Sequence, residues 1–135
     1  MANALYGKFK QKLLEGSINL TSDTIKAVLV DIAAYSVSIN SDEFLSSIPS
    51  GDRIATSSAL TGKSVTLGVF DADDVTWTSV SGDPSEAVVL IKDTGDPATS
   101  PLICYIDTAT GLAVTPNGNN ITCTWSNGAS KIFAL

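Results

Sequence analysis

The sequence predicts a mainly β protein: an antiparallel β-sandwich, of which a jelly roll is one form, preceded by a short N-terminal helix. Three observations favour this class. Short runs of β-branched and aliphatic residues follow one another from residue 24 onward, and turn-forming residues separate them. Serine and threonine occupy 31 of the 135 positions. With 44% hydrophobic residues, a chain of this length is expected to form one domain around its own core.

The helix is predicted over residues 4–15. Its apolar stripe has the i, i+4, i+8 spacing of one helix face and consists of Leu5, Phe9 and Leu13, with Tyr6 and Leu14 beside it. Gly16 follows at the position where a left-handed residue commonly ends a helix. We therefore expect residues 1–16 to form an amphipathic helix or arm, and residues 17–135 to form a single β domain.

Eight strands are predicted after the helix. They span residues 24–31, 53–60, 63–70, 74–80, 86–93, 102–108, 121–125 and 131–135. One helical turn is predicted between the first two strands, because Ser41 is a favourable N-cap and the acidic Asp42 and Glu43 follow it. The connections between later strands are rich in Gly, Pro, Asn and Asp, which suit turns.

The two cysteines are predicted to point inward. In 102–108, the face that holds Cys104 alternates with a face that holds Ile103, Tyr105 and Asp107, and the charge of Asp107 assigns that second face to the outside. Cys123 shares its face with Trp125. Buried thiols are inert, because burial raises their pKa. A disulfide between them requires neighbouring strands, which the sequence leaves open.

Composition argues against several classes of partner. The formal charge is −6, with eight basic and fourteen acidic residues, so nucleic acid is not expected to bind. No apolar run exceeds five residues, which predicts no membrane-spanning helix and no membrane partner. The N-terminal residues lack the apolar core of a secretory signal, so export by that route is not expected.

Catalytic, cofactor and metal sites are not predicted. Histidine is absent, which removes the commonest general base and metal ligand. The acidic cluster of Asp71, Asp73 and Asp74 lacks the glycine and distal glutamate of an EF-hand loop, so a solvated turn is favoured over a cation site. The carboxylate pairs of Asp93 with Asp96 and of Asp83 with Glu86 lie beside Gly or Pro, as turn residues do.

Two further motifs have structural explanations. The triplet at 62–64, Gly-Lys-Ser, lacks the preceding glycine and the following helix of a phosphate loop, which excludes nucleotide binding of that type. Trp77 and Trp125 are candidate platforms for a sugar, but isolated tryptophans in strands are more often core residues. Core packing is therefore favoured for both.

The basic helix is the clearest indication of a protein partner. Residues 1–12 hold Lys8, Lys10 and Lys12 and no acid, whereas the rest of the chain has a net charge of −9. A helix this short must dock on something. It packs either on its own domain or on a neighbouring subunit. For the second alternative, the candidate partner-binding residues are Leu5, Tyr6, Lys8, Phe9, Lys12 and Leu13, and deletion of residues 1–15 is expected to leave the β domain folded.

Several segments resemble small virion structural proteins of tailed bacteriophages. They are MANALY at 1–6, DTIKAVLVD at 23–31, IDTATGL at 106–112, TPNG at 115–118 and NGASKIFAL at 127–135. The resemblance implies a compact β protein without an active site or cofactor. Such a protein is assembled in the bacterial host cytoplasm and located in the virion.

Within that family, a capsid decoration or cement protein is expected, which stabilises the shell by bridging capsid subunits. Its partners would be the major capsid protein and further copies of itself, as a dimer or trimer. The alternative is a tail or fibre-associated domain that binds a tail protein and recognises a receptor glycan on the host surface.

Overall fold

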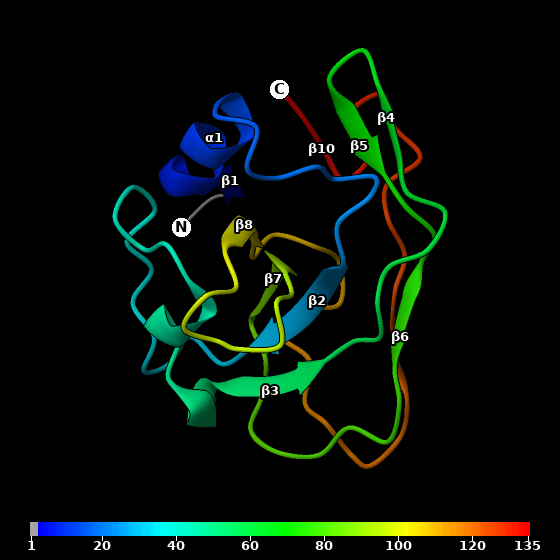
Figure 1. The fold of residues 1–135 in the computed structure, drawn as a ribbon. Helices are drawn as coiled ribbons and strands as arrows, with labels where there is room; N and C mark the ends of the chain where they lie inside the picture. The colour runs from blue at the N-terminus through cyan, green and yellow to red at the C-terminus, as the bar shows by residue number, and fades with distance from the viewer. Residues whose placement is uncertain (1–2) are drawn as a thin grey trace.

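The computed structural model describes residues 3–135 and shows, in that range, antiparallel β sheets with a single short α-helix (Figure 1). The elements are β1 (Ala4–Leu5), α1 (Gly7–Leu14), β2 (Ile25–Val30), the 3-10 helices η1 (Leu45–Ser47) and η2 (Ser50–Asp52), β3 (Arg53–Thr56), β4 (Ser64–Thr66), β5 (Val69–Asp71), β6 (Val75–Trp77), β7 (Ala87–Lys92), β8 (Leu102–Ile106), β9 (Ile121–Cys123) and β10 (Phe133–Ala134). The predicted mainly β class with one short helix is confirmed. No helix in the described range is long and apolar enough to cross a bilayer.

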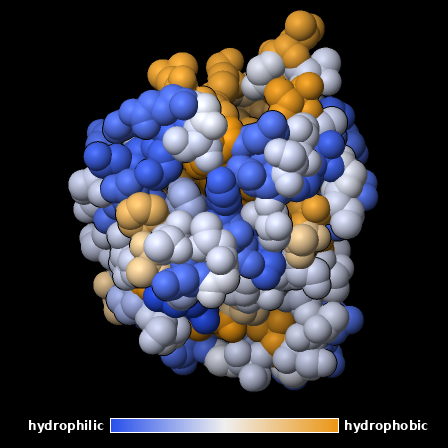
Figure 2. Space-filling model, viewed as in Figure 1, coloured by the Kyte–Doolittle hydropathy of each residue, from blue (hydrophilic) through white to orange (hydrophobic). Residues whose placement is uncertain are grey.

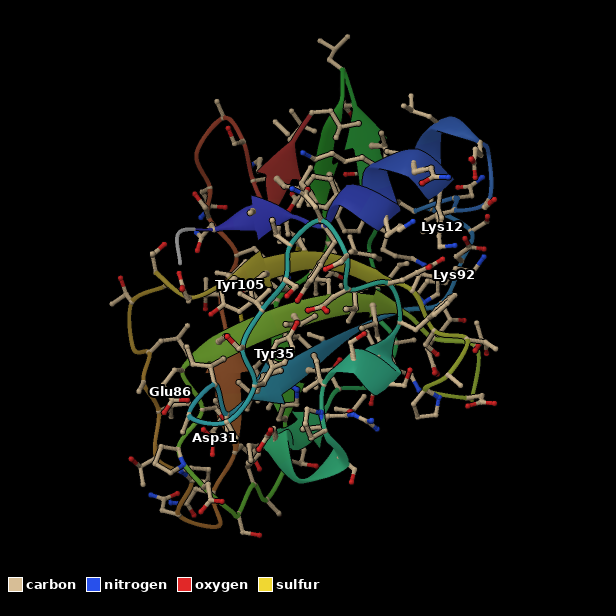
Figure 3. All side chains as sticks on the ribbon, turned by 90° about the vertical axis from the view of Figure 1, so that its left-hand side faces the viewer. Lys12, Asp31, Tyr35, Glu86, Lys92 and Tyr105 are labelled. Atoms are coloured by element: carbon tan, nitrogen blue, oxygen red, sulfur yellow. The ribbon has the colours of Figure 1, made fainter. Side chains whose placement is uncertain are left out.

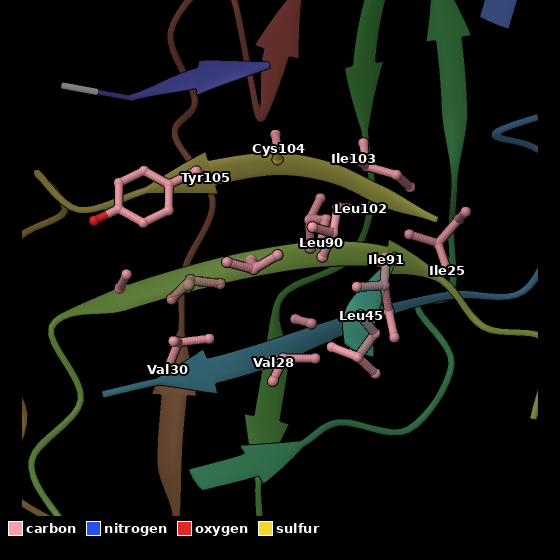
Figure 4. Close-up of a cluster of buried hydrophobic side chains, with 14 of the residues drawn as sticks. Ile25, Val28, Val30, Leu45, Leu90, Ile91, Leu102, Ile103, Cys104 and Tyr105 are labelled. Atoms are coloured by element: carbon pink, nitrogen blue, oxygen red, sulfur yellow. The ribbon is translucent and has the colours of Figure 1, made fainter. Parts of the chain in front are cut away.

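A five-stranded sheet in the order β1-β8-β7-β2-β3 forms the centre of the molecule. Strands β2 and β7 pair along their whole length, from Ile25 opposite Lys92 to Val30 opposite Ala87. Both strands are almost continuous runs of buried aliphatic residues, as expected of strands covered on both faces. Figure 4 shows these side chains packed together with those of β8.

The segment 31–52 covers one face of this sheet, on the side where Tyr35 and Tyr105 lie (Figure 3). Tyr105 is opposite Val89, which is opposite Val28, so these three residues share that face, and all are buried. The prediction that Tyr105 and Ile103 face outward is therefore wrong. The charge of Asp107 marks only the end of the strand, because the loop covers the residues before it.

Two smaller sheets cover the opposite face. One has the order β10-β5-β4 and the other pairs β6 with β9. The indole N–H of Trp77 in β6 donates to the carbonyl of Ala27 in β2, at 3.0 Å, which fixes the small sheet against the large one. In Figure 1 the small sheets and the segment 31–52 lie on opposite sides of the central strands. Sheets of five, three and two strands do not establish a jelly roll.

The prediction of one strand over 63–70 is wrong, because a hairpin interrupts it. Strands β4 and β5 pair antiparallel, and only Leu67 and Gly68 connect them. Both residues have positive φ, 51° and 79°, as the type I′ turn of a two-residue hairpin requires. The 74–80 and 121–125 segments form shorter strands than predicted, and the described residues contain ten strands rather than eight.

The helix begins at Gly7, later than predicted, because the sheet uses the residues before it. Leu5 pairs with Cys104, and the Tyr6 N–H donates to the carbonyl of Ile103. The predicted end at Gly16 is confirmed. Gly16 has φ 77°, its N–H donates to the carbonyl of Leu13, and the next N–H donates to that of Lys12, which together form a Schellman motif.

The predicted helical turn near Ser41 is displaced. The 3-10 helix η1 starts at Leu45, and Phe44 before it provides no side-chain cap. The carboxylate of Asp42 instead accepts hydrogen bonds from the Ser38 N–H at 2.9 Å and from the Tyr35 hydroxyl at 2.8 Å. Asp42 therefore closes the preceding loop and does not cap a helix.

Candidate functional site

Tyr6 attaches the N-terminal helix to its own domain. Its side chain is fully buried, and its hydroxyl lies 3.0 Å from that of Tyr35. Because Tyr35 donates its proton to the carboxylate of Asp42, it accepts from Tyr6, so a chain of hydrogen bonds joins the two segments. Burial raises the pKa of both tyrosines far above the ordinary value.

Phe9 completes this attachment. It is fully buried, and its ring meets that of Phe133 edge-on, with centroids 5.7 Å apart. Leu5 and Leu13 are half-buried and pack against the same core. Of the two arrangements left open by the sequence, the helix adopts packing on its own domain. Tyr6 and Phe9 are consequently inaccessible to a partner.

The lysines of the predicted partner-binding set differ in their surroundings. Lys12 lies 2.7 Å from a carboxylate oxygen of Glu43 and 5.1 Å from the ring centroid of Phe44 (Figure 3 labels Lys12). The hydrogen bond from Lys12 lowers the pKa of Glu43. Lys8 is half-buried and Lys10 is exposed. Lys8 also lies close enough to Glu43 to help lower the pKa of its carboxyl group, so Lys10 is the lysine of α1 that is fully open to solvent.

Three leucines at one end of the molecule are far more exposed than any residue of the predicted set. Leu14 ends α1 and is 90% exposed, Leu67 at the hairpin tip is 99% exposed, and Leu135 after β10 is 69% exposed. The three elements lie at the same end in Figure 1, and apolar side chains project from that end in Figure 2. We name these three residues the apolar end.

Backbone pairing holds the apolar end together. The N–H of Leu135 donates to the carbonyl of Gly68, beside Leu67, at 2.9 Å. Strand β10 pairs with β5, and Phe133 of β10 contacts Phe9 of α1. Leu67 and Leu135 thus come from backbone-paired elements, and the helix that ends at Leu14 packs on the same elements through Phe9.

Leu67 occupies a backbone conformation that leucine rarely adopts. A β-carbon at positive φ costs roughly 1–2 kcal/mol, and type I′ turns accordingly favour Asn or Gly. Strain of this kind persists where another requirement maintains it. Leu67 is a candidate contact residue because its apolar side chain is exposed and because its backbone is strained.

The apolar end is not apparent from the sequence. Leu14 lies at the margin of the predicted buried stripe, and Leu67 and Leu135 lie within predicted strands. Gly68 is the signal that could have located the turn, because an isolated glycine within a strand-like run marks a bulge or a bend. No signal in the sequence shows that the three leucines lie at the same end of the molecule.

A cleft of about 650 Å³ separates the central sheet from the β6–β9 ribbon. Leu29, Val88 and Ile106 of the central sheet line it, as do residues of the ribbon and of 108–112. Trp77 and Trp125 border it but are buried, and their indole N–H groups donate to the backbone carbonyls of Ala27 and Asp73. Neither ring presents a free face for stacking on a sugar.

Two carboxylates of the acidic cluster, Asp73 and Asp74, have structural partners. Asp73 accepts a hydrogen bond from the Thr61 hydroxyl at 3.0 Å, and Asp74 accepts one from the Trp125 N–H at 2.9 Å. Across residues 3–135, no three potential ligand side chains are grouped for a metal ion.

In the two carboxylate pairs considered as catalysts, Asp93, Asp96 and Glu86 bind nearby groups of the protein. Asp93 binds Lys26 at 2.7 Å and accepts from the Gly95 N–H, and these two contacts lower its pKa. Asp96 accepts from the Ala98 N–H, within the turn. Glu86 accepts from the N–H of Ile32, which ties the strand to the covering segment (Figure 3 labels Glu86).

The thiols lie in different sheets and are both free. Cys104 is buried as predicted, and burial raises its pKa to about 12. Cys123 is only half-buried at the wall of the cleft, and its pKa is raised by burial to about 11. Both thiols are therefore protonated near neutral pH, where they are poor nucleophiles.

The chain matches no protein-family model, and no curated protein is significantly similar to it. Its function is therefore inferred from the apolar end and from the resemblance of the sequence segments.

Proposed function

We propose that the chain is a structural protein of a tailed-bacteriophage virion, a capsid decoration or cement protein that attaches to the shell through its apolar end. The fold would then be a β-sandwich in which the small sheets form the second layer. Assembly would take place in the bacterial host cytoplasm, and the major capsid protein would be the partner.

The apolar end is the observation that carries this proposal. Three exposed leucines held by packed elements offer a rigid patch, and burying one leucine on a partner contributes about 1.5–3 kcal/mol. Lys10 is an exposed positive charge on α1, the helix that ends at Leu14, in a chain that is acidic overall. A surface of this kind suits a partner that is apolar at the centre of the contact and acidic at its rim.

The buried tryptophans favour the capsid over a tail receptor-binding role. A glycan-binding domain presents exposed aromatic faces, whereas Trp77 and Trp125 are in the core. The tail-associated alternative therefore depends on loops without exposed tryptophan.

The first experiment measures how many copies of the chain a purified virion holds, by quantitative mass spectrometry against the major capsid protein. A number of the same order as the major capsid protein supports decoration. A handful of copies per virion would favour the tail-associated alternative. Absence of the chain from virions would overturn the virion proposal.

Leu67→Asn is expected to raise stability and weaken attachment at the same time. Asparagine tolerates the positive φ of this turn, so thermal unfolding should shift upward by a few degrees, corresponding to about 1 kcal/mol. Loss of the apolar contact should weaken binding to virion shells about tenfold or more. Differential scanning fluorimetry and a shell-binding titration measure the two effects.

Ser79→Asn is the matched control. Ser79 also has φ 51° and is exposed, but it lies in the loop after β6, where its N–H donates to the Asn120 side chain. This variant should gain stability without any change in shell binding. Unchanged binding by Leu67→Asn itself would show that the apolar end is not the attachment surface.

A further inference from the structure

Strand β4 is the open edge of its sheet. It pairs with β5 on one side only, and Ser64, Val65 and Thr66 are all exposed. In a two-residue hairpin the two residues that flank the turn, here Thr66 and Val69, hydrogen-bond to each other. Along an antiparallel strand, the N–H and C=O groups of successive residues point alternately toward the partner strand and away from it. The N–H and C=O of Val65 therefore point away from β5.

The carbonyl of Phe70 supports this direction. Val65 is opposite Phe70, and the Phe70 carbonyl accepts from the N–H of Ile132, on the side away from β4. The Val65 and Phe70 pair is thus the non-hydrogen-bonded kind. Among residues 3–135, Val65 makes no backbone hydrogen bond to another segment.

The side chain of Val65 is also incompletely covered. It lies on the same face of the sheet as the buried Phe70, yet it remains 48% exposed because the sheet ends there. The apolar face that covers the core therefore continues to an uncovered edge. A further strand beside β4 would bury it.

Three common protections of an edge strand, namely charge, proline and a bulge, are absent from the short strand β4. Strand β3, at the edge of the large sheet, begins with Arg53 and has a register shift against β2. By contrast, the seven residues from Ser64 to Phe70 carry no charge, and β4 pairs in regular register.

We propose that β4 pairs antiparallel with β4 of a second copy of this chain, about a two-fold axis at Val65. Each Val65 then exchanges both backbone hydrogen bonds with the other, and Ser64 lies opposite Thr66. The two sheets join into one six-stranded sheet in the order β10-β5-β4-β4-β5-β10.

Charge favours a second copy at this position. Two chains of net charge −6 repel over most of their surfaces, but the uncharged hairpin brings no like charges together. The pairs formed are also complementary, since valine meets valine and serine meets threonine. The inference concerns the purified protein alone, so it is independent of the virion proposal, and the copy number in virions does not affect its test.

Sedimentation analysis over a range of concentrations tests the proposal. The wild type should change from 14.0 kDa to twice that mass as concentration rises. Val65→Lys places two like charges opposite each other and should weaken association at least tenfold. Thr56→Lys, at an exposed position of β3, an edge strand of the five-stranded sheet, is the matched control and should dimerise as the wild type does.

A cross-link provides a second test that does not require weakened association. Opposed Cα atoms in a hydrogen-bonded antiparallel pair are about 5.5 Å apart, within the range a disulfide spans. In a Cys123→Ser background, Val65→Cys should form a covalent dimer on mild oxidation, whereas Thr56→Cys should not.

Three outcomes would overturn the proposal: a wild type that stays monomeric at all concentrations, a dimer that persists in Val65→Lys, or Val65→Cys that fails to cross-link. A dimer abolished by Leu67→Asn but retained in Val65→Lys would assign self-association to the apolar end instead. Thermal unfolding of each variant verifies that it is folded.

Discussion

Phe9→Ala is expected to destabilise the protein by about 3–5 kcal/mol, the usual cost of removing a buried phenylalanine from a core. The side chain is fully buried and contacts the ring of Phe133 at the other end of the chain. Since domains of this size are stable by about 5–15 kcal/mol, one substitution in α1 should remove a large part of the total. Chemical denaturation with urea measures it.

Leu14→Ala in the same helix is the control. Leu14 is 90% exposed, so this change should alter stability by no more than about 0.5 kcal/mol. Deletion of residues 1–15 should unfold the domain, because it removes both Tyr6 and Phe9 from the core, contrary to the expectation from sequence. If Phe9→Ala cost less than about 1 kcal/mol, the helix would instead behave as a detachable arm.

Raising the pH should unfold the protein in one step that coincides with ionisation of its tyrosines. The chain has three tyrosines, and burial raises the pKa of each: that of Tyr105 to about 12, and those of Tyr6 and Tyr35 further. Burial acts on Cys104 in the same direction. Groups whose folded pKa is raised stabilise the fold fully below their unfolded pKa, and that contribution is lost as pH rises.

The loss should begin near pH 8.5, where unfolded cysteine ionises, and steepen above pH 10, where unfolded tyrosine does. Tyrosinate absorbance and circular dichroism, recorded together against pH, should change at the same point. The same titration in concentrated denaturant should show tyrosine ionisation centred near pH 10. A gradual rise in tyrosinate absorbance near pH 10 from protein that stays folded would contradict the burial of these side chains.

Local sequence patterns predicted much of the fold. The runs at 24–31, 86–93 and 102–108 are the central strands β2, β7 and β8, because β-branched and aliphatic residues suit a sheet buried on both faces. Gly16 ended the helix as predicted. These features depend on neighbours within a few residues, which the sequence displays directly.

The features that were missed depend on distant contacts or on strained backbone. Tyr6, Tyr35 and Asp42 form one hydrogen-bonded chain, but nothing in their spacing indicates that they meet. Leu67 lies within a predicted strand because leucine seldom adopts positive φ, but in the structure its φ is 51° and it forms a turn. The predicted partner-binding set follows the apolar side of the helix. Apolar side chains suit a protein core as well as an interface, and Tyr6 and Phe9 lie in the core.

The pairing of β1 with β8 affects the order in which the protein folds during synthesis. Residues 4–5 pair with residues 104–105, so β1 has no pairing partner until β8 has been synthesised about 100 residues later. At about 5–20 residues per second, that delay is about 5–20 s. Throughout it, Phe9 also lacks Phe133, so the nascent chain exposes an apolar helix that chaperones can bind. Native folding of this domain is therefore completed only after β8 and Phe133 have been synthesised.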